Sequence, residues 1–208
     1  MEELAQLGIV PVDISVLRSF FSSYSFPNDK ILLLEDQKKL IRLKKGMYIV
    51  SPDVSGELLS VELIANHLYG PSYVSMESAL RYYGLIPEKV YTIRSSTTNR
   101  SRKFGNIIGT FQYVSVYEDY YSVGINQVRV NNRLTFLIAS PEKALCDLII
   151  TTPHLNFQSA KALEIYLNED LRLDMQAFSE FNPDIVSQCV ETGKKRKALE
   201  LLLKLLLR

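Results

Sequence analysis

Apolar residues recur at helical spacing twice in the first forty residues of the chain. Residues 13–24 carry the first repeat, with Asp13 placed to cap a helix. Residues 27–39 carry the second, which starts with a proline where a helix does not need the missing N–H. Residues 40–50 then alternate in polarity around the turn sequence Lys44-Lys45-Gly46. Two helices followed by a tight basic hairpin is the order of a winged-helix module.

Turn residues at positions 51–56 predict a linker after this first module. Helical spacing then returns in two short segments, residues 60–69 and 75–83. Each segment is followed by a glycine, Gly70 or Gly84, which commonly ends a helix. We therefore expect two short helices here.

Between residues 90 and 139 the apolar period changes from helical to alternating. Stretches rich in β-branched and aromatic residues predict strands over residues 90–93, 110–116, 125–130 and 133–138. Asn131-Asn132 predicts a two-residue hairpin turn between the last two strands, because asparagine tolerates a positive φ. Antiparallel pairing is expected in this region.

The remainder of the chain has a helical pattern throughout. Ser140-Pro141-Glu142 predicts a helix start, because it combines a capping serine, a proline at the first position and an early carboxylate. Further helices are predicted over residues 159–167, 174–181, 183–192 and 194–208. The predicted fold class is α+β. A winged-helix-type module spans residues 1–53, and a mixed domain spans 54–208, with strands over 90–139 and helices over 140–208.

Composition adds few constraints to this picture. The 208 residues are 47% apolar and 23% charged, with a formal net charge of +1, so only local clusters of charge indicate a partner. The chain starts without the pattern of a signal peptide, and its most apolar stretch, residues 199–207, is far shorter than the ~20 residues of a membrane span. We expect a cytoplasmic protein with no membrane partner.

The two cysteines, Cys146 and Cys189, lie in apolar segments without metal-ligand spacing. Buried free thiols in a reducing compartment are the simplest interpretation. No metal site and no cofactor are predicted.

Residues 27–50 hold the first cluster of charge, with six basic and three acidic residues. A basic hairpin after a helix is where a winged helix contacts phosphates, and Gly46 would allow close approach to a DNA backbone. A solvated helix face with a lysine-rich turn is the alternative. The acidic Glu35 and Asp36 count against deep insertion of this helix, so Asn28 and Lys30 at its start are the candidates for reading bases. The predicted DNA-binding residues are Asn28, Lys30, Lys38, Lys39, Arg42, Lys44, Lys45 and Tyr48.

A second cluster, residues 94–103, holds four basic residues and no acid, interleaved with hydroxyl side chains. This mixture suits phosphate oxygens, although a flexible polar loop between strands explains it equally well. The candidate residues for a second nucleic-acid contact are Arg94, Arg100, Arg102 and Lys103.

A third cluster, residues 194–197, precedes the leucine-rich final helix. A basic amphipathic helix can bind a membrane surface. Here the apolar residues cover most of the helix, which favours packing against the rest of the fold or a partner helix.

Catalysis needs titratable groups that converge, and the sequence offers little in that respect. Its two histidines, His67 and His154, lie in a predicted helix and in a loop, and each is better explained by packing or exposure. Phosphate-binding loops, nucleophile elbows and zinc-protease motifs are absent from the sequence. No catalytic residues are assigned, and we expect that the protein is not an enzyme.

Three blocks of sequence resemble AbiEi-type antitoxins of type IV toxin–antitoxin systems. The first comprises Lys30-Ile31, Leu34 and residues 40–48. The second is residues 70–86, with Gly70-Pro71 and Ser75-Met-Glu-Ser-Ala-Leu80. The third is residues 139–148, Ala-Ser-Pro-Glu-Lys-Ala-Leu-Cys-Asp-Leu.

The resemblance implies a transcriptional repressor that binds inverted repeats in its own operon through the N-terminal module. It also implies an antitoxin that counteracts a nucleotidyltransferase-like toxin without forming a stable complex with it. Beyond residue 150 no motif carries the resemblance.

Two alternatives remain open from the sequence. The N-terminal module and the leucine-rich final helix can instead serve protein assembly, including self-association, without specific DNA binding. A nucleic-acid-processing enzyme that uses residues 94–103 is the less favoured alternative.

Overall fold

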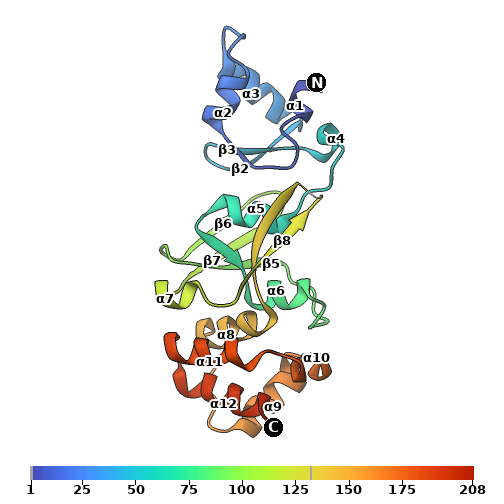
Figure 1. The fold of residues 1–208 in the computed structure, drawn as a ribbon. Helices are drawn as coiled ribbons and strands as arrows, with labels where there is room; N and C mark the ends of the chain where they lie inside the picture. The colour runs from blue at the N-terminus through green and yellow to red at the C-terminus, as the bar shows by residue number, and fades with distance from the viewer. Residues whose placement is uncertain (1, 132) are drawn as a thin grey trace.

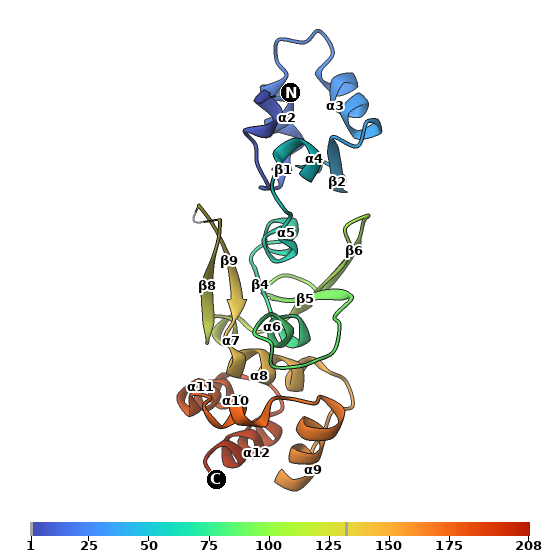
Figure 2. The ribbon, with the colours of Figure 1, turned by 90° about the vertical axis from the view of Figure 1, so that its right-hand side faces the viewer.

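The computed structural model describes residues 2–131 and 133–208 of the chain. Its elements form an elongated molecule in which the N-terminal part, a six-stranded sheet and a group of C-terminal helices follow one another along the long axis (Figure 1). The two termini lie at opposite ends of this axis (Figures 1 and 2). The fold is of mixed α+β class.

The N-terminal part alternates short helices with a three-stranded antiparallel sheet of order β1-β3-β2. Its elements are α1 (Glu2–Ala5), β1 (Val12–Asp13), α2 (Ile14–Phe20), α3 (Pro27–Asp36), β2 (Leu40–Lys44) and β3 (Met47–Val50). The Asp13 carboxylate accepts the backbone N–H of Ser15 at 3.1 Å, and Pro27 is the first residue of α3. The predicted helix cap, proline start and hairpin are confirmed, although α2 ends at Phe20, four residues early.

The two faces of this small sheet pack in different directions because side chains alternate along a strand. On one face Leu40 and Tyr48 pack with Leu17 and Ile31 of the helices. On the other face Leu43, Ile49 and the preceding Ile9 belong to the main apolar core of the protein. The small sheet therefore lies between its own helices and the central part of the molecule. The division at residue 53 stays a prediction.

Three helices and the first strand of the central sheet follow β3 in the chain. They are α4 (Pro52–Ser55), α5 (Val61–Leu68), β4 (Ser72–Val74) and α6 (Met76–Tyr82). The predicted linker at residues 51–56 includes the one-turn helix α4, and the two predicted helices are confirmed. Ser60 caps α5 by accepting the N–H of Leu63 at 3.2 Å.

The central sheet has the strand order β6-β7-β5-β4-β9-β8. Its remaining elements are β5 (Thr92–Thr97), β6 (Arg102–Gly105), β7 (Thr110–Ser115), α7 (Glu118–Tyr121), β8 (Ile125–Val130) and β9 (Leu134–Ala139). Two neighbouring pairs, β4 with β9 and β5 with β7, are parallel, so the expectation of antiparallel strands was only partly right. The inner strand β4 precedes residue 90 and was missed, because three residues are too few to establish a period.

The register between β8 and β9 pairs Val130 with Leu134, so the connection spans residues 131–133. This is one residue longer than the predicted two-residue turn. Asn131 has the expected positive φ of 49°. Asn132 lies outside the described residues.

The C-terminal part is helical as predicted. It comprises α8 (Pro141–Thr151), α9 (Ala160–Ile165), the π-helical turn η1 (Tyr166–Asp170), α10 (Met175–Ser179), α11 (Pro183–Thr192) and α12 (Arg196–Leu206). Ser140 caps α8, and in α12 Leu199, Leu202 and Leu205 are buried. The leucine-rich helix thus packs within the fold, which confirms the favoured prediction. Among the helices described, none has the length and apolar character needed to cross a membrane.

Candidate nucleic-acid interface

The β2–β3 hairpin contacts the central part of the molecule through polar groups as well as apolar ones. Lys44 Nζ donates to the carbonyl oxygen of Leu68, at the end of α5, at 2.6 Å. Asn106, in the β6–β7 turn, donates its side-chain amide to the carbonyl of Leu43 at 3.0 Å. The hairpin is thereby fixed against α5 and the β6–β7 turn.

Lys44 has an environment unlike that of a free surface lysine. The carbonyl it binds lies at the C-terminus of a helix, where the partial negative charge favours a cation. Partial burial, reinforced by the nearby Arg102 guanidinium, lowers the pKa of Lys44 below its usual value, while the Asp13 carboxylate opposes this shift. The sequence predicted Lys44 as a phosphate contact, but its ammonium already has a partner inside the protein.

Arg102 of β6 lies close to the hairpin over a group of aromatic rings. Its guanidinium carbon is 5.5 Å from the ring centre of Tyr69 and 5.8 Å from that of Phe104. The Lys44 ammonium is 5.7 Å from the same Phe104 ring. Lys44 and Arg102, which belong to different basic clusters of the sequence, therefore meet at one place in the structure.

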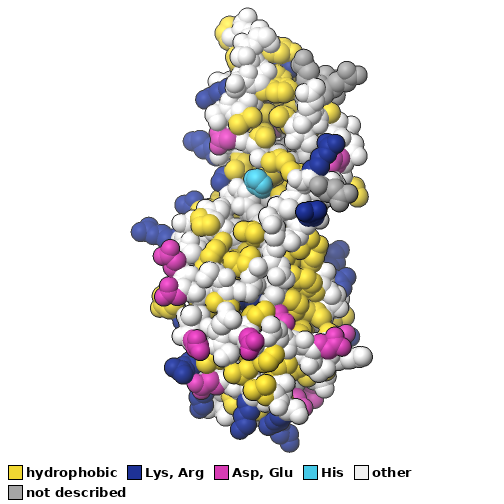
Figure 3. Space-filling view, in the orientation of Figure 1, with side chains coloured by type: hydrophobic (Ala, Val, Ile, Leu, Met, Phe, Trp, Pro, Cys, Tyr) yellow, Lys and Arg dark blue, Asp and Glu magenta, His cyan; other side chains and the backbone are white. Residues whose placement is uncertain are grey.

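Three further basic residues lie close in the chain to the residues of this contact and are exposed. Lys45 follows Lys44 in the hairpin turn, Lys103 follows Arg102 in β6, and Arg100 precedes β6. The Tyr69 hydroxyl donates to the Arg100 carbonyl at 3.1 Å, which ties this segment to the aromatic group. We refer to Lys44, Lys45, Arg100, Arg102 and Lys103 as the junction surface. Figure 3 shows lysine and arginine side chains along the left-hand edge, on the side where the hairpin and β6 lie in Figure 1.

Two predicted DNA-binding residues of the hairpin strands are engaged within the N-terminal part. Tyr48 is buried in its core, 3% exposed, so it is a packing residue and has little surface to offer a phosphate. Arg42 is exposed but binds Glu35 of α3 at 2.7 Å and lies over the Tyr48 ring at 5.5 Å. Since β3 is the middle strand of the small sheet, its residue 48 faces the helices and not the solvent.

The remaining predicted DNA-binding residues of the N-terminal part lie away from the hairpin turn. Lys38 and Lys39 precede β2, at the opposite end of that strand from Lys45. At the start of α3, Asn28 accepts a hydrogen bond from the Arg18 guanidinium at 2.9 Å, and Lys30 lies 4.8 Å from the Tyr24 ring centre. The structure therefore does not gather all eight predicted residues on one surface.

Residues 94–103 do not form the polar loop that was offered as an alternative for this cluster. They include most of β5, a short connection and the start of β6. Arg94 lies in β5, is 17% exposed, and holds both carboxylate oxygens of Glu77 at 2.7 and 2.9 Å. It is therefore separated from the three exposed basic residues, and only Arg100, Arg102 and Lys103 of this cluster belong to the junction surface.

A second polar group, which the sequence did not reveal, lies in the core between the central sheet and α8. Asp147 Oδ2 accepts hydrogen bonds from the hydroxyls of Tyr73, Ser75 and Ser96 at 3.0, 2.6 and 2.8 Å. Lys143, one helical turn earlier, places its ammonium 3.3 Å from Asp147 Oδ1. Both charged side chains are fully buried. We call Tyr73, Ser75, Ser96, Lys143 and Asp147 the buried centre.

The charges of the buried centre are well compensated. Lys143 Nζ also donates to the Tyr120 carbonyl at 2.7 Å and lies 2.9 Å from the centre of the Tyr120 ring. Burial, together with the Asp147 carboxylate, raises the pKa of Tyr73 far above its usual value, so its hydroxyl remains a donor. The only sequence indication was a lysine and an aspartate at i,i+4 in an otherwise apolar helix.

The buried centre joins two of the three sequence blocks described above. Tyr73 and Ser75 belong to the block at residues 70–86, and Asp147 belongs to the block at residues 139–148. Because both charged side chains are fully buried, their arrangement serves packing and hydrogen bonding in the fold.

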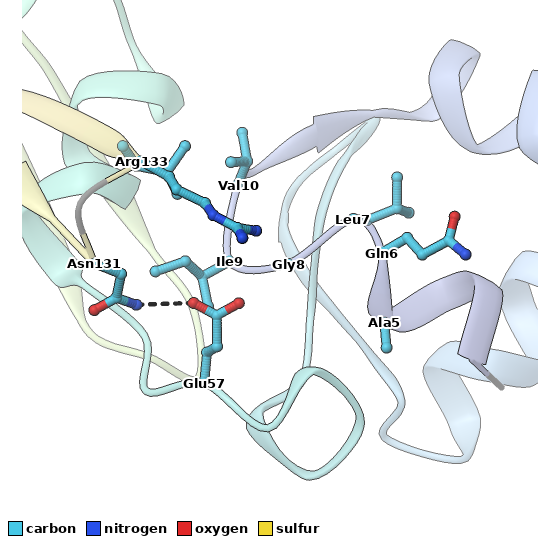
Figure 4. A pocket seen from close by; sticks show the side chains of 10 residues that line it. Ala5, Gln6, Leu7, Gly8, Ile9, Val10, Glu57, Asn131 and Arg133 are labelled. Carbon is cyan, nitrogen blue, oxygen red and sulfur yellow. Dashed lines mark hydrogen bonds between the residues drawn. The ribbon is translucent and has the colours of Figure 1, made fainter.

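A pocket of about 530 Å³ lies where residues 5–10 pass the β8–β9 connection. Figure 4 shows Glu57 and Arg133 at this pocket, with the Asn131 amide directed at Glu57. That amide donates to Glu57 Oε2 at 2.8 Å. The pocket is distinct from the junction surface, because the two share no residue.

Groups suited to metal or thiol chemistry are sparse. In residues 2–131 and 133–208, no three or more His, Cys, Asp or Glu side chains gather in a way that could hold a metal ion. Cys146 and Cys189 are buried free thiols, as predicted. The pKa of the Cys146 thiol is raised, mainly by its contact with Cys189 and by burial.

Comparison with known proteins gives a structural neighbour but no family. No protein-family model matches the sequence, and no curated protein matches it. The crystal structure of the Rv2827c protein from Mycobacterium tuberculosis superposes with a TM-score of 0.51 at 17% sequence identity. The match covers 97% of this chain and 78% of the Rv2827c chain. At this identity the likeness shows a shared fold alone, and the mixed α+β architecture is common to both.

Proposed function

We propose that the protein is a DNA-binding regulator whose N-terminal part is a winged-helix-type module. The order α1-β1-α2-α3-β2-β3, with the hairpin closing a three-stranded antiparallel sheet, supports the assignment of the module. The observation that carries the proposal is the junction surface, where the hairpin turn and β6 bring basic side chains together. The proposed role is regulatory and includes no catalytic step.

The exposed members of the junction surface suit a phosphate backbone. Lys45, Arg100, Arg102 and Lys103 are exposed to solvent, whereas Lys44 is partly buried and holds the hairpin against α5. Lysine and arginine contacts to phosphates give affinity that depends on salt and not on sequence. Sequence preference therefore has to come from other contacts of the same module.

The resemblance to AbiEi-type antitoxins supports a more specific version of the proposal. In that version the protein represses its own toxin–antitoxin operon by binding inverted repeats, and it counteracts a nucleotidyltransferase-like toxin. Two of the three similar blocks meet in the buried centre. Residues of both blocks are therefore needed for the same hydrogen-bonded group in the fold. The neutralising surface is not assigned to any residue.

DNA binding is tested by titrating the full chain into labelled duplex DNA and measuring fluorescence anisotropy. We expect the region upstream of its own gene to bind more tightly than a scrambled duplex at ~150 mM salt. Equal affinity for the two duplexes would exclude sequence-specific repression.

The surface itself is tested by the triple variant Lys45→Glu, Arg100→Glu, Lys103→Glu. The expected result is a loss of at least about tenfold in affinity. The slope of log affinity against log salt concentration should also become shallower, by about 0.9 for each phosphate that is no longer bound. The control is Lys161→Glu, Lys197→Glu, Lys204→Glu, which makes the same change of charge at exposed positions of α9 and α12. An equal loss in both variants would remove the junction surface from the proposal.

The antitoxin role is tested separately by co-expression with the protein encoded beside its gene. If that neighbour is a nucleotidyltransferase that arrests growth, we expect the wild-type chain to restore growth. The triple variant separates the two roles, because it should lose DNA binding and retain rescue. Failure of the wild-type chain to restore growth would exclude the antitoxin role.

A further inference from the structure

The outward face of α3 differs in character from the junction surface. Asp29, Leu32, Leu33 and Asp36 share this face, opposite the buried Ile31 and Leu34. Leu32 is 49% exposed and Leu33 is 47% exposed, and Phe26, just before the helix, is 71% exposed. The face thus presents an apolar centre with a carboxylate near each end.

Two basic residues near α3, Lys30 and Arg42, do not lie on this face. Lys30 is on the flank, with its ammonium over the Tyr24 ring at 4.8 Å. Arg42 lies on another flank and binds Glu35. The two aspartates on the outward face are exposed, and no ion pair to either is present among the described residues.

These charges decide which ligand the face fits. Phosphate groups would be repelled by Asp29 and Asp36, and half-exposed leucines gain nothing from a charged backbone. A second copy of α3 packed antiparallel would bring Asp29 of one chain towards Asp36 of the other, which repels. A partner with apolar side chains between lysines or arginines would bury Leu32 and Leu33 and pair with both carboxylates.

We propose that the outward face of α3 is a docking surface for a basic, amphipathic segment of another protein. This inference does not rest on DNA binding, since the junction surface and the α3 face share no residue. The molecule then carries a pair of separate surfaces of opposite charge, one for nucleic acid and one for protein.

The test uses the full chain and a fluorescent synthetic helical peptide with leucine on one face and lysine on the other. A second peptide, with glutamate in place of lysine, is the charge control. We expect the lysine peptide to bind, the glutamate peptide to bind far more weakly, and added salt to reduce the difference between them.

Two variants locate the binding on α3. Leu32→Ala with Leu33→Ala should weaken binding of the lysine peptide about tenfold or more, and Asp29→Asn with Asp36→Asn about fivefold. The matched control is Glu118→Gln with Asp119→Asn, which removes two exposed carboxylates from α7 and should leave binding unchanged. Circular dichroism checks that each variant is folded, which we expect because the replaced side chains are about half exposed or polar.

Three outcomes would overturn the proposal. The first is equal weakening by the α3 and α7 carboxylate variants. The second is a dimer in sedimentation that Leu32→Ala with Leu33→Ala dissociates, because the face would then belong to a second copy. The third is loss of DNA binding in the folded leucine variant, because the face would then contact nucleic acid. If the chain fails to bind DNA at all, the peptide experiment still decides this proposal.

Discussion

Lys143 and Asp147 of α8 are fully buried, whereas Lys45, Arg100 and Lys103 of the junction surface are exposed. In the buried centre every charge has a partner, and three hydroxyls converge on one carboxylate oxygen. On the junction surface Lys44 and Arg102 have contacts within the protein, and every member except Lys44 is exposed. The comparison separates charges that maintain the fold from charges that remain available to a ligand.

The sharpest test of this difference compares two ion pairs with the same i,i+4 spacing. Lys143–Asp147 in α8 is fully buried, whereas Arg196–Glu200 in α12 is largely exposed. Asp147→Ala leaves a buried ammonium without its counter-ion and three hydroxyls without their acceptor, so we expect a loss of about 3–5 kcal/mol in the free energy of unfolding. Glu200→Ala should cost less than about 1 kcal/mol. Urea unfolding of both variants measures the difference, and similar losses would show that the buried centre has no special role in stability.

Alkaline pH tests Tyr73 of the buried centre, together with two other buried tyrosines, without a mutation. Burial raises the pKa of Tyr73, Tyr113 and Tyr120 above the usual value of 10.0. Unfolded chains release these protons near pH 10 and the folded chain keeps them, so stability is full below pH 10 and falls as pH rises. Each tyrosine contributes a slope of about 1.4 kcal/mol per pH unit. Tyrosinate absorbance that rises before the near-ultraviolet circular dichroism is lost would contradict this prediction.

Lys44 at the end of β2 and Lys45 in the hairpin turn should differ less in their effect on stability. Lys44→Ala removes the hydrogen bond to the Leu68 carbonyl and the interaction with the Phe104 ring, so we expect a loss of about 1–2 kcal/mol. Lys45→Ala should change the free energy of unfolding by less than about 0.5 kcal/mol. Lys44→Met keeps an apolar side chain of similar length, so its loss of stability measures the contribution of the ammonium group alone. Equal losses at the two positions would mean that Lys44 does not hold the hairpin.

The smallest change in stability is expected at the exposed positions of the junction surface. Lys103→Ala and Arg100→Ala should each leave the free energy of unfolding within about 0.5 kcal/mol of wild type, since both side chains are exposed. Both substitutions should instead lower DNA affinity. Thermal unfolding measures the effect on stability, and fluorescence anisotropy on the same samples measures the effect on DNA binding. A large loss of stability would mean that these residues help to maintain the fold.

Local rules in the sequence predicted most helix boundaries. Asp13 and Ser140 cap helices because their short side chains accept a nearby N–H, and Pro183 begins α11 as expected. The same rules failed for β4, which has only three residues, and for the pairing of strands that are distant in the chain. Strand neighbours depend on packing over the whole sheet, which no short stretch of sequence specifies.

The candidate nucleic-acid interface was predicted from clusters of basic residues, and the structure showed which of these residues have partners within the protein. Counting basic residues selected Lys45, Arg100 and Lys103 as candidate contacts, and all three are exposed in the structure. It could not distinguish them from Lys44, Arg42 and Arg94, whose partners Leu68, Glu35 and Glu77 come from other elements. The outward face of α3 was overlooked for a similar reason, because its four residues are recognised as one surface only when the buried side of the helix is known.

Within each segment, then, the sequence determined the helix caps, the hairpin, the α+β class and the two clusters of basic residues. Tertiary structure alone decided that those clusters meet, that Tyr48 is buried, and that Lys143 and Asp147 form a charged pair in the core. The physical reason is the range of the forces involved. Caps and turns are set by hydrogen bonds between residues a few positions apart, whereas burial and charge pairing depend on residues that only the folded chain brings together.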